Sequence, residues 1–322
     1  MLQHKKIILI ICLQIPLIVS AFQEKIKENN PGKRWGHVLI YDQFRDQLVL
    51  FGGTRERGIY LNDTWIWDNK KWTKINTIGP SERGFCAATF HKDRNTIIIH
   101  GGRGNDRTTY GDTWEWDGKE WKQLDVKSGY IADHHQMVYL NDEKQILAYG
   151  GWNGKDVIGD TWFWNGKWEK SNESSPPKRA SFGMAFNTSN NAVYLYGGLW
   201  VNGQYADIWK RTKGKWQPIA EPYSNSSLDH HMLIYDENRD NIIGFGGKNY
   251  RRQMQGKTFK IDNRQIETLS EEGPINRHSF GFTFASKQQM AYLYGGKKYL
   301  GDDQIALGDF WKWDGKTWNL IQ

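Results

Sequence analysis

The chain has 322 residues, of which 25% are charged and 38% hydrophobic, and these proportions exclude both a disordered protein and a multi-span membrane protein. It contains 34 Gly, 17 Trp, 15 Tyr and 14 Phe but only 8 Pro, which favours an all-β fold with glycine in turns and aromatic residues in strands. Two cysteines exclude a disulfide scaffold, and a formal net charge of +7 is too modest to indicate a nucleic-acid partner.

The first segment predicts an export signal. Lys5 and Lys6 precede an almost wholly apolar run, residues 7–21, which is short for a membrane span. Val19 and Ala21 supply the small residues that suit cleavage after position 21. We expect a secreted or periplasmic protein with no integral membrane span after cleavage. An uncleaved anchor is the alternative.

A repeat fills the rest of the chain. Paired glycines, each preceded by an apolar run, recur at intervals of 49, 49, 47, 49 and 49 residues. The pairs are Gly52-Gly53, Gly101-Gly102, Gly150-Gly151, Gly197-Gly198, Gly246-Gly247 and Gly295-Gly296. Six units of this length, without a helical period, indicate the four-stranded blades of a propeller.

Each unit is predicted to form four short strands. In the first unit we expect His37–Tyr41, Gln47–Phe51, Thr64–Trp67 and Trp72–Ile75. The expected division is a signal peptide at 1–21, a lead-in segment at 22–33, and blades at about 34–82, 83–131, 132–178, 179–227, 228–276 and 277–322.

The repeat resembles the kelch family of β-propellers. The resemblance rests on the double glycine, on Asp-Thr-Trp-x-Trp at 63–67, 112–116 and 160–164, and on a closing Trp such as Trp72 or Trp121. It spans residues 34–322 and implies an all-β, six-bladed propeller with four antiparallel strands per blade. Residues present in nearly every blade are expected to be structural: the tryptophans pack between blades, and the repeated Asp hydrogen-bonds N–H groups of the loop.

Residues outside the repeat are the candidates for function. Trp35, Trp152 and Trp200 are the three tryptophans outside the repeated positions, and all belong to the face that carries the loops after the double glycines. That face also carries basic and aromatic residues, namely Arg103, Arg107, Tyr250, Arg251 and Arg252. We predict a site there for a glycan or protein ligand, with an anionic ligand favoured. The alternatives are tryptophans that only pack their loops and a merely solvated basic face.

One further pattern precedes the double glycines. His37, His135 and His231 occupy the same position in alternate blades, and two of them belong to repeated Asp-His-His triplets at 133–135 and 229–231. Three such histidines on the axis would bind a metal. The favoured interpretation is that they point sideways into neighbouring blades, so we predict neither metal nor cofactor.

The resemblance also extends to galactose oxidases, which share the kelch propeller and place copper-site Cys and Tyr residues near this level. Only Cys86 matches, since His135 stands where a Tyr would be needed. The cross-linked cofactor of that family is therefore not expected.

We predict a binding module rather than an enzyme. A sugar-modifying enzyme is the alternative, because exported six-bladed kelch proteins include sialic acid mutarotases. A metal-dependent protein that uses the three histidines is the third hypothesis.

Overall fold

The computed structural model describes residues 29–55, 58–124, 129–220, 226–262 and 265–322. Six four-stranded antiparallel sheets follow one another in chain order, as the sequence predicts. We number them as blades 1 to 6. The expected signal peptide, residues 1–21, lies outside the described residues.

Every blade uses its strands in sequence order from the axis outward. The innermost strands are β1 (Val38–Asp42), β5 (Ala87–His91), β9 (Gln136–Leu140), β13 (Gly183–Asn187), β19 (Met232–Asp236) and β23 (Gly281–Ala285). The second strands are β2 (Gln47–Phe51), β6 (Thr96–His100), β10 (Gln145–Trp152), β14 (Ala192–Tyr196), β20 (Asn241–Phe245) and β24 (Met290–Leu300).

The two outer strands complete each blade. The third strands are β3 (Thr64–Trp67), β7 (Thr113–Trp116), β11 (Val157–Trp164), β17 (Ile208–Thr212), β21 (Thr258–Asp262) and β25 (Asp303–Trp313). The outermost are β4 (Trp72–Ile75), β8 (Trp121–Leu124), β12 (Trp168–Lys170), β18 (Lys215–Ala220), β22 (Gln265–Ser270) and β26 (Trp318–Leu320). Blade 4 adds a small ribbon, β15 (Leu199–Trp200) with β16 (Gly203–Gln204). In blade 1 only the innermost strand differs from expectation, since it begins one residue later.

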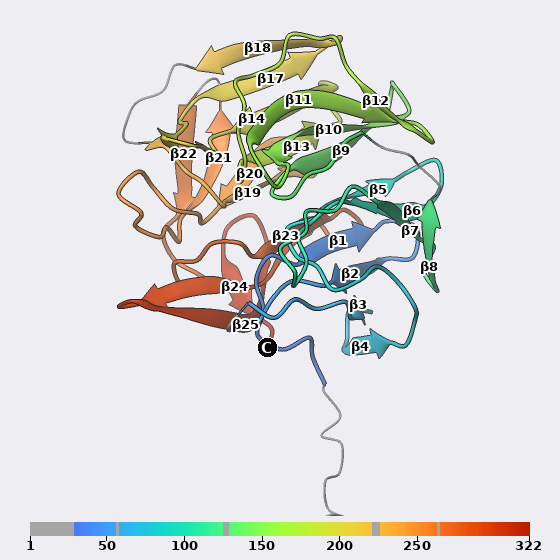
Figure 1. Ribbon diagram of the computed structural model, residues 1–322. Helices are drawn as coiled ribbons and strands as arrows, with labels where there is room; N and C mark the ends of the chain where they lie inside the picture. The colour runs from blue at the N-terminus through green and yellow to red at the C-terminus, as the bar shows by residue number, and fades with distance from the viewer. Residues whose placement is uncertain (1–28, 56–57, 125–128, 221–225, 263–264) are drawn as a thin grey trace, which may run out of the picture.

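The six blades surround a common axis (Figure 1), with the first strand of each blade innermost. Strand β1 packs against both β5 and β23, so the last blade meets the first and closes the ring. The hydrophobic clusters join neighbouring blades. One of them combines Leu39 and Trp65 of blade 1 with Tyr292 and Phe310 of blade 6. Burial between blades therefore holds the ring together.

The repeated tryptophans lie at these junctions, as predicted. Trp65 and Trp116 are fully buried. The closing Trp121 of blade 2 donates from Nε1 to Thr64 Oγ1 of blade 1 at 2.9 Å, and Trp168 of blade 3 does the same to Thr113 of blade 2. Each such indole therefore adds a directional bond to the apolar contact between blades.

The repeated Asp has a different partner from the one expected. Asp63 accepts hydrogen bonds from the guanidinium of the buried Arg34, at 2.7 and 2.9 Å, and from Trp65 Nε1 at 2.7 Å. Arg34 Nη1 also donates to the Gly52 carbonyl oxygen. The same pairing recurs as Arg83–Asp112, Arg179–Asp207 and Arg277–Asp309. These carboxylates therefore fix a buried arginine rather than loop N–H groups, because a buried guanidinium needs a charged partner.

Both ends of the described chain lie on blade 6. Arg34 N donates to the Leu307 carbonyl oxygen, and Phe310 N donates to that of Gln322. Strand β26 pairs with β25 of its own blade, so each blade is one continuous piece of sequence. Within the described residues, no helix is long and apolar enough to cross a membrane.

Candidate functional site

The loop face is closed at the axis by a ring of backbone hydrogen bonds. One residue per blade, just before the innermost strand, donates its N–H to the carbonyl oxygen of the equivalent residue in the preceding blade, and blade 1 donates to blade 6. We call these six the axial ring: Gly36, Phe85, His134, Ser181, His230 and Ser279. All have φ between 54° and 64°, in the left-handed region that non-glycine residues rarely adopt. The ring therefore presents five side chains, and the bare backbone of Gly36, around one point.

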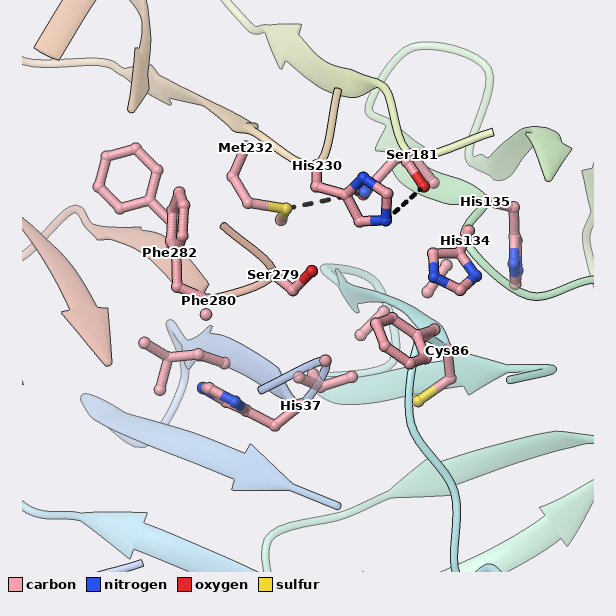
Figure 2. Close-up of a pocket in the computed structure, with 18 of the residues that line it drawn as sticks. His37, Cys86, His134, His135, Ser181, His230, Met232, Ser279, Phe280 and Phe282 are labelled. Atoms are coloured by element: carbon pink, nitrogen blue, oxygen red, sulfur yellow. Dashed lines mark hydrogen bonds between the residues drawn. The ribbon is translucent and has the colours of Figure 1, made fainter. Parts of the chain in front are cut away.

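These side chains line a cavity on the axis with a volume of about 110 Å³. Figure 2 shows His134, Ser181, His230 and Ser279 converging at its rim. Deeper in, the lining is mostly apolar and includes Phe280, Phe282 and Met232. The site thus combines polar groups at the mouth with an apolar interior, as small-molecule sites commonly do.

Two Asp–His pairs lie at the mouth. Nδ1 of His134 is 2.5 Å from Asp133 Oδ1, and Nδ1 of His230 is 2.5 Å from Asp229 Oδ1. The two imidazoles meet edge to face with centroids 5.5 Å apart. Burial lowers the pKa of His230 to about 4, although Asp229 acts in the opposite direction. The His230 ring is therefore neutral at pH 7, and one of its two nitrogens has a free lone pair.

Positive charge gathers beside these pairs. Lys248 and Lys297 each follow a double glycine directly and form backbone bridges to Asp229 and His278. The ammonium of Lys297 lies 5.0 Å from the centroid of the Trp35 ring. Burial, together with the charge of Lys248, lowers the pKa of Lys297 to about 8. Two cations are thus held near each other in a partly dehydrated place, which is the electrostatic condition for binding an anion.

The three predicted tryptophans differ in burial and in the residues that they contact. Trp35 is buried, only 6% exposed, and acts as a floor for Lys297. Trp152 is half-buried and pairs through its backbone with Asp133. Trp200 is 36% exposed in the β15–β16 ribbon, 6.4 Å from the Tyr205 ring. In the part of the chain that the structure describes, no ring contact joins the three.

The predicted basic residues lie mostly at loop tips. Arg107, Arg251 and Arg252 are exposed, and the Arg251 guanidinium lies 5.2 Å from the exposed Tyr250 ring. Arg103 is half-buried and bridges to Gly84, the position that Lys248 and Lys297 occupy in their own blades. Arg103 therefore belongs to the mouth, whereas the other three belong to its outer rim.

The three alternate histidines face neighbouring blades. His37 meets the Tyr294 ring of blade 6 edge to face at 5.6 Å, and its Nε2 would lie 2.7 Å from a Cβ at Gly281. His231 packs likewise on Gly183 and Tyr196 of blade 4. His135 meets His100 of blade 2 at 5.5 Å. Among the described residues, no group of three or more His, Cys, Asp or Glu is placed to hold a metal ion. Burial raises the pKa of Cys86 to about 11, so this thiol is protonated at pH 7.

Sequence reasoning did not single out Ser181 or Lys297. Each residue of the axial ring lies sixteen positions before the first glycine of its own pair. The sequence signal for the ring was therefore one position upstream of the alternate histidines. The repeated Asp-His-His triplets pointed to the same level. Only the structure shows that the first histidine of each triplet, rather than the second, faces the axis.

The other end of the axis carries a second cavity of about 360 Å³. The turns after the innermost strands line it with one polar side chain per blade, and these residues are Gln43, Lys92, Asn141, Thr188, Glu237 and Ser286. This mouth lacks the paired carboxylates and histidines of the loop face, so the loop face is the stronger candidate.

Fold and site together define a β-propeller with a cavity on its axis. The family model of the KLHDC2/KLHL20/DRC7 Kelch-repeats domain matches residues 19–198, which is more than half of the chain. The chain therefore belongs to the kelch-repeat family.

Two individual proteins are also similar to this chain. An F-box/kelch-repeat protein of Arabidopsis thaliana is 37% identical over 65 residues, which is 19% of this chain and 13% of that protein. The chain thus matches only a small part of that relative's length. The solved structure of YjhT superposes with a TM-score of 0.71 at 13% identity, covering 91% of this chain and 99% of the other. At that identity the match concerns the fold alone.

Proposed function

We propose that this propeller is an exported binding module that takes an anionic ligand, a glycan or a protein, on the loop face at the axial mouth. The observation that carries the proposal is Lys297. Among the described residues, no carboxylate lies within ion-pair distance of its ammonium, and Gln304 is its hydrogen-bond partner at 2.8 Å. An anion bound there would supply the missing countercharge.

The neighbouring residues support the same ligand chemistry. Lys248 shares its charge with Asp229 at 3.4 Å, so Lys297 carries more of the uncompensated charge. Trp35 gives the site an aromatic wall beside that charge. The exposed Arg251 and Arg252 extend the positive potential outward, where they would increase the rate of encounter more than the affinity.

A glycan array on the mature protein, followed by titration calorimetry on the best ligands, tests the proposal. We expect carboxylated or sulfated glycans, or acidic peptides, to bind and their neutral counterparts to fail. Lys297→Gln should weaken binding about tenfold, a typical effect of losing one charged contact. Lys122→Gln on the outer strand β8 removes the same charge from an exposed position and should leave binding unchanged. Equal binding of neutral and anionic ligands, or equal effects of the two variants, would contradict the proposal.

A sugar-modifying enzyme of the sialic acid mutarotase type is the second candidate. It is favoured by the Asp133–His134 and Asp229–His230 pairs, because interconversion of anomers needs groups that accept and return protons. Exchange between the anomers of N-acetylneuraminate, followed by NMR with and without the protein, separates the two functions. Binding without faster exchange leaves the binding module, and faster exchange that is lost in His134→Gln favours the enzyme.

A further inference from the structure

Three side chains at the axial mouth form a connected line. The Ser181 hydroxyl is 3.2 Å from His230 Nε2, and His230 Nδ1 is 2.5 Å from Asp229 Oδ1. The two bonds use opposite nitrogens of one imidazole, and Figure 2 shows the bond between His230 and Ser181 as a dashed line. This is the order of groups in a Ser-His-Asp nucleophilic triad.

The protonation pattern follows from the partners. An ionised carboxylate accepts hydrogen bonds only, so Nδ1 of His230 must carry the proton that goes to Asp229. In the neutral ring, Nε2 then holds a lone pair, and Ser181 Oγ–H donates to it. The serine proton is thus already directed at the base that would remove it.

The Asp229 carboxylate is held in place from its other side. Gln204 Nε2 donates to Oδ2, and the Lys248 ammonium lies 3.4 Å from Oδ1. Ser227 Oγ in turn donates to Gln204 Oε1 at 3.1 Å. Asp229 is only 3% exposed. These contacts keep the carboxylate ionised and oriented, which is the task of the third member of a triad.

Ser181 itself is placed unusually. Its φ of 56° lies in the left-handed region, and its side chain lines the axial cavity. Its backbone N–H and C=O are both engaged in the axial ring, so the hydroxyl position is fixed by the main chain. The cavity below is mostly apolar and has a volume of about 110 Å³. A short acyl group is of a size that this cavity accommodates.

The chain contains its own comparisons. The Asp133–His134 pair has the same geometry, but the residue of the preceding blade is Phe85, which stacks on His134 at 4.0 Å and offers no nucleophile. Ser279 occupies the ring position of Ser181 in blade 6 with φ 55°, but its hydroxyl contacts Nδ1 of the adjacent His278, for which the described residues supply no aspartate bond. Of the two Asp–His pairs, only Asp229–His230 continues to a serine.

We propose that Ser181, His230 and Asp229 form a catalytic triad that hydrolyses esters of short carboxylic acids. Ser181 Oγ attacks the ester carbonyl carbon while its proton passes to His230 Nε2, and the tetrahedral intermediate collapses as the leaving alcohol takes that proton. Water then gives a proton to His230 and attacks the acyl-serine, which releases the carboxylic acid and restores the Ser181 hydroxyl. Ester and water thus become acid and alcohol, and no other reactant is needed. This activity is separate from anion binding at Lys297.

Hydrolysis of p-nitrophenyl acetate, with mass spectrometry of the protein, provides the test. We expect turnover above background, an acetyl group on the peptide that contains Ser181, and much slower turnover of p-nitrophenyl octanoate. Ser181→Ala should lower kcat at least 100-fold, whereas Ser189→Ala, on the exposed turn after β13 of the same blade, should stay within about twofold. A small organophosphorus fluoridate should likewise label Ser181 in the unaltered protein.

The remaining controls separate chemistry from folding and from ligand binding. Thermal melts and anion binding of Ser181→Ala should match those of the unaltered protein. If this variant loses anion binding but keeps its esterase turnover, Ser181 belongs to the anion site and not to a triad. Asp229→Asn should lower kcat more than it changes KM. Turnover that survives in Ser181→Ala, or acetylation and labelling found elsewhere while Ser181 stays free, would overturn the triad.

Discussion

At the scale of single residues, equivalent side chains in different blades have different hydrogen bonds. Trp72 and Trp121 close blades 1 and 2 at the same position, and both are buried. Trp121 Nε1 donates to Thr64, whereas Trp72 Nε1 is buried without a partner among the described residues. The repeat pattern cannot distinguish them, because the partner comes from the preceding blade.

This pair allows a matched measurement of one hydrogen bond. Trp121→Phe should lower the free energy of unfolding by about 1–3 kcal/mol more than Trp72→Phe, because it leaves the Thr64 hydroxyl buried and unpaired. Chemical denaturation of both variants gives the difference. Equal losses would mean that packing alone, and not the indole N–H, accounts for the contribution of the closing tryptophan.

At the scale of the element, the residues directly before the innermost strands include histidines that are buried in uncharged form. Burial lowers the pKa of His37 and of His231 to about 3, from an ordinary value of 6.5. The unfolded chain therefore takes up protons below pH 6.5 while the folded chain does not. Stability is fully present above pH 6.5 and decreases as the pH falls toward 3.

The expected slope is about 1.4 kcal/mol per pH unit for each such histidine below its unfolded pKa. His231→Phe uses the side chain that blades 4 and 6 carry at this position, as Phe182 and Phe280, and should flatten the loss of stability between pH 6.5 and 5. Lys92→Gln at an exposed turn should leave the slope unchanged. Measuring the free energy of unfolding at several pH values tests this prediction. Parallel plots of that free energy against pH for His231→Phe and the unaltered protein would contradict the role assigned to His231.

Strand positions were predictable because they depend on local alternation and on turn residues. The expected Gln47–Phe51 and Thr64–Trp67 coincide with β2 and β3. For the candidate site, the sequence predicted only the face of the propeller on which it lies. Loop tryptophans and arginines stood out by residue type, but Trp35 proved buried and Arg251 peripheral. Ser181 is ordinary in sequence, and its contact with His230 spans 49 residues and two blades.

At the scale of the whole molecule, the ring closes without exchanging a strand between its first and last blades. Arg34 and Gln322 both bond to β25, and burial between β1 and β23 joins blade 1 to blade 6 in the same way as the other junctions. The junction between blades 6 and 1, where the chain ends lie, is therefore held together in the same way as the other junctions.

A circular permutant tests this equivalence. Joining Gln322 to residue 29 through a short linker and opening the chain between the exposed Glu271 and Glu272 should give a cooperatively folding protein with nearly the same melting temperature. Deleting residues 277–322 exposes two apolar blade faces and should abolish cooperative unfolding. Loss of folding in the permutant would show that the blade 6–blade 1 junction depends on the native chain ends.

The axial ring fixes the backbone at six positions without fixing the residue type, and this matters for how such a protein can diversify. Its six main-chain bonds run head to tail in one rotational sense and do not depend on which residue stands at each place, as Gly36, Phe85, His134, Ser181, His230 and Ser279 already demonstrate. Each position can mutate with little effect on its neighbours' backbone, because the left-handed conformation is already accommodated for glycine, aromatic, imidazole and hydroxyl side chains alike. The mouth thus has six positions at which the residue can vary while the hydrogen-bonded backbone ring stays the same. New chemistry could arise there by single substitutions, without refolding a loop.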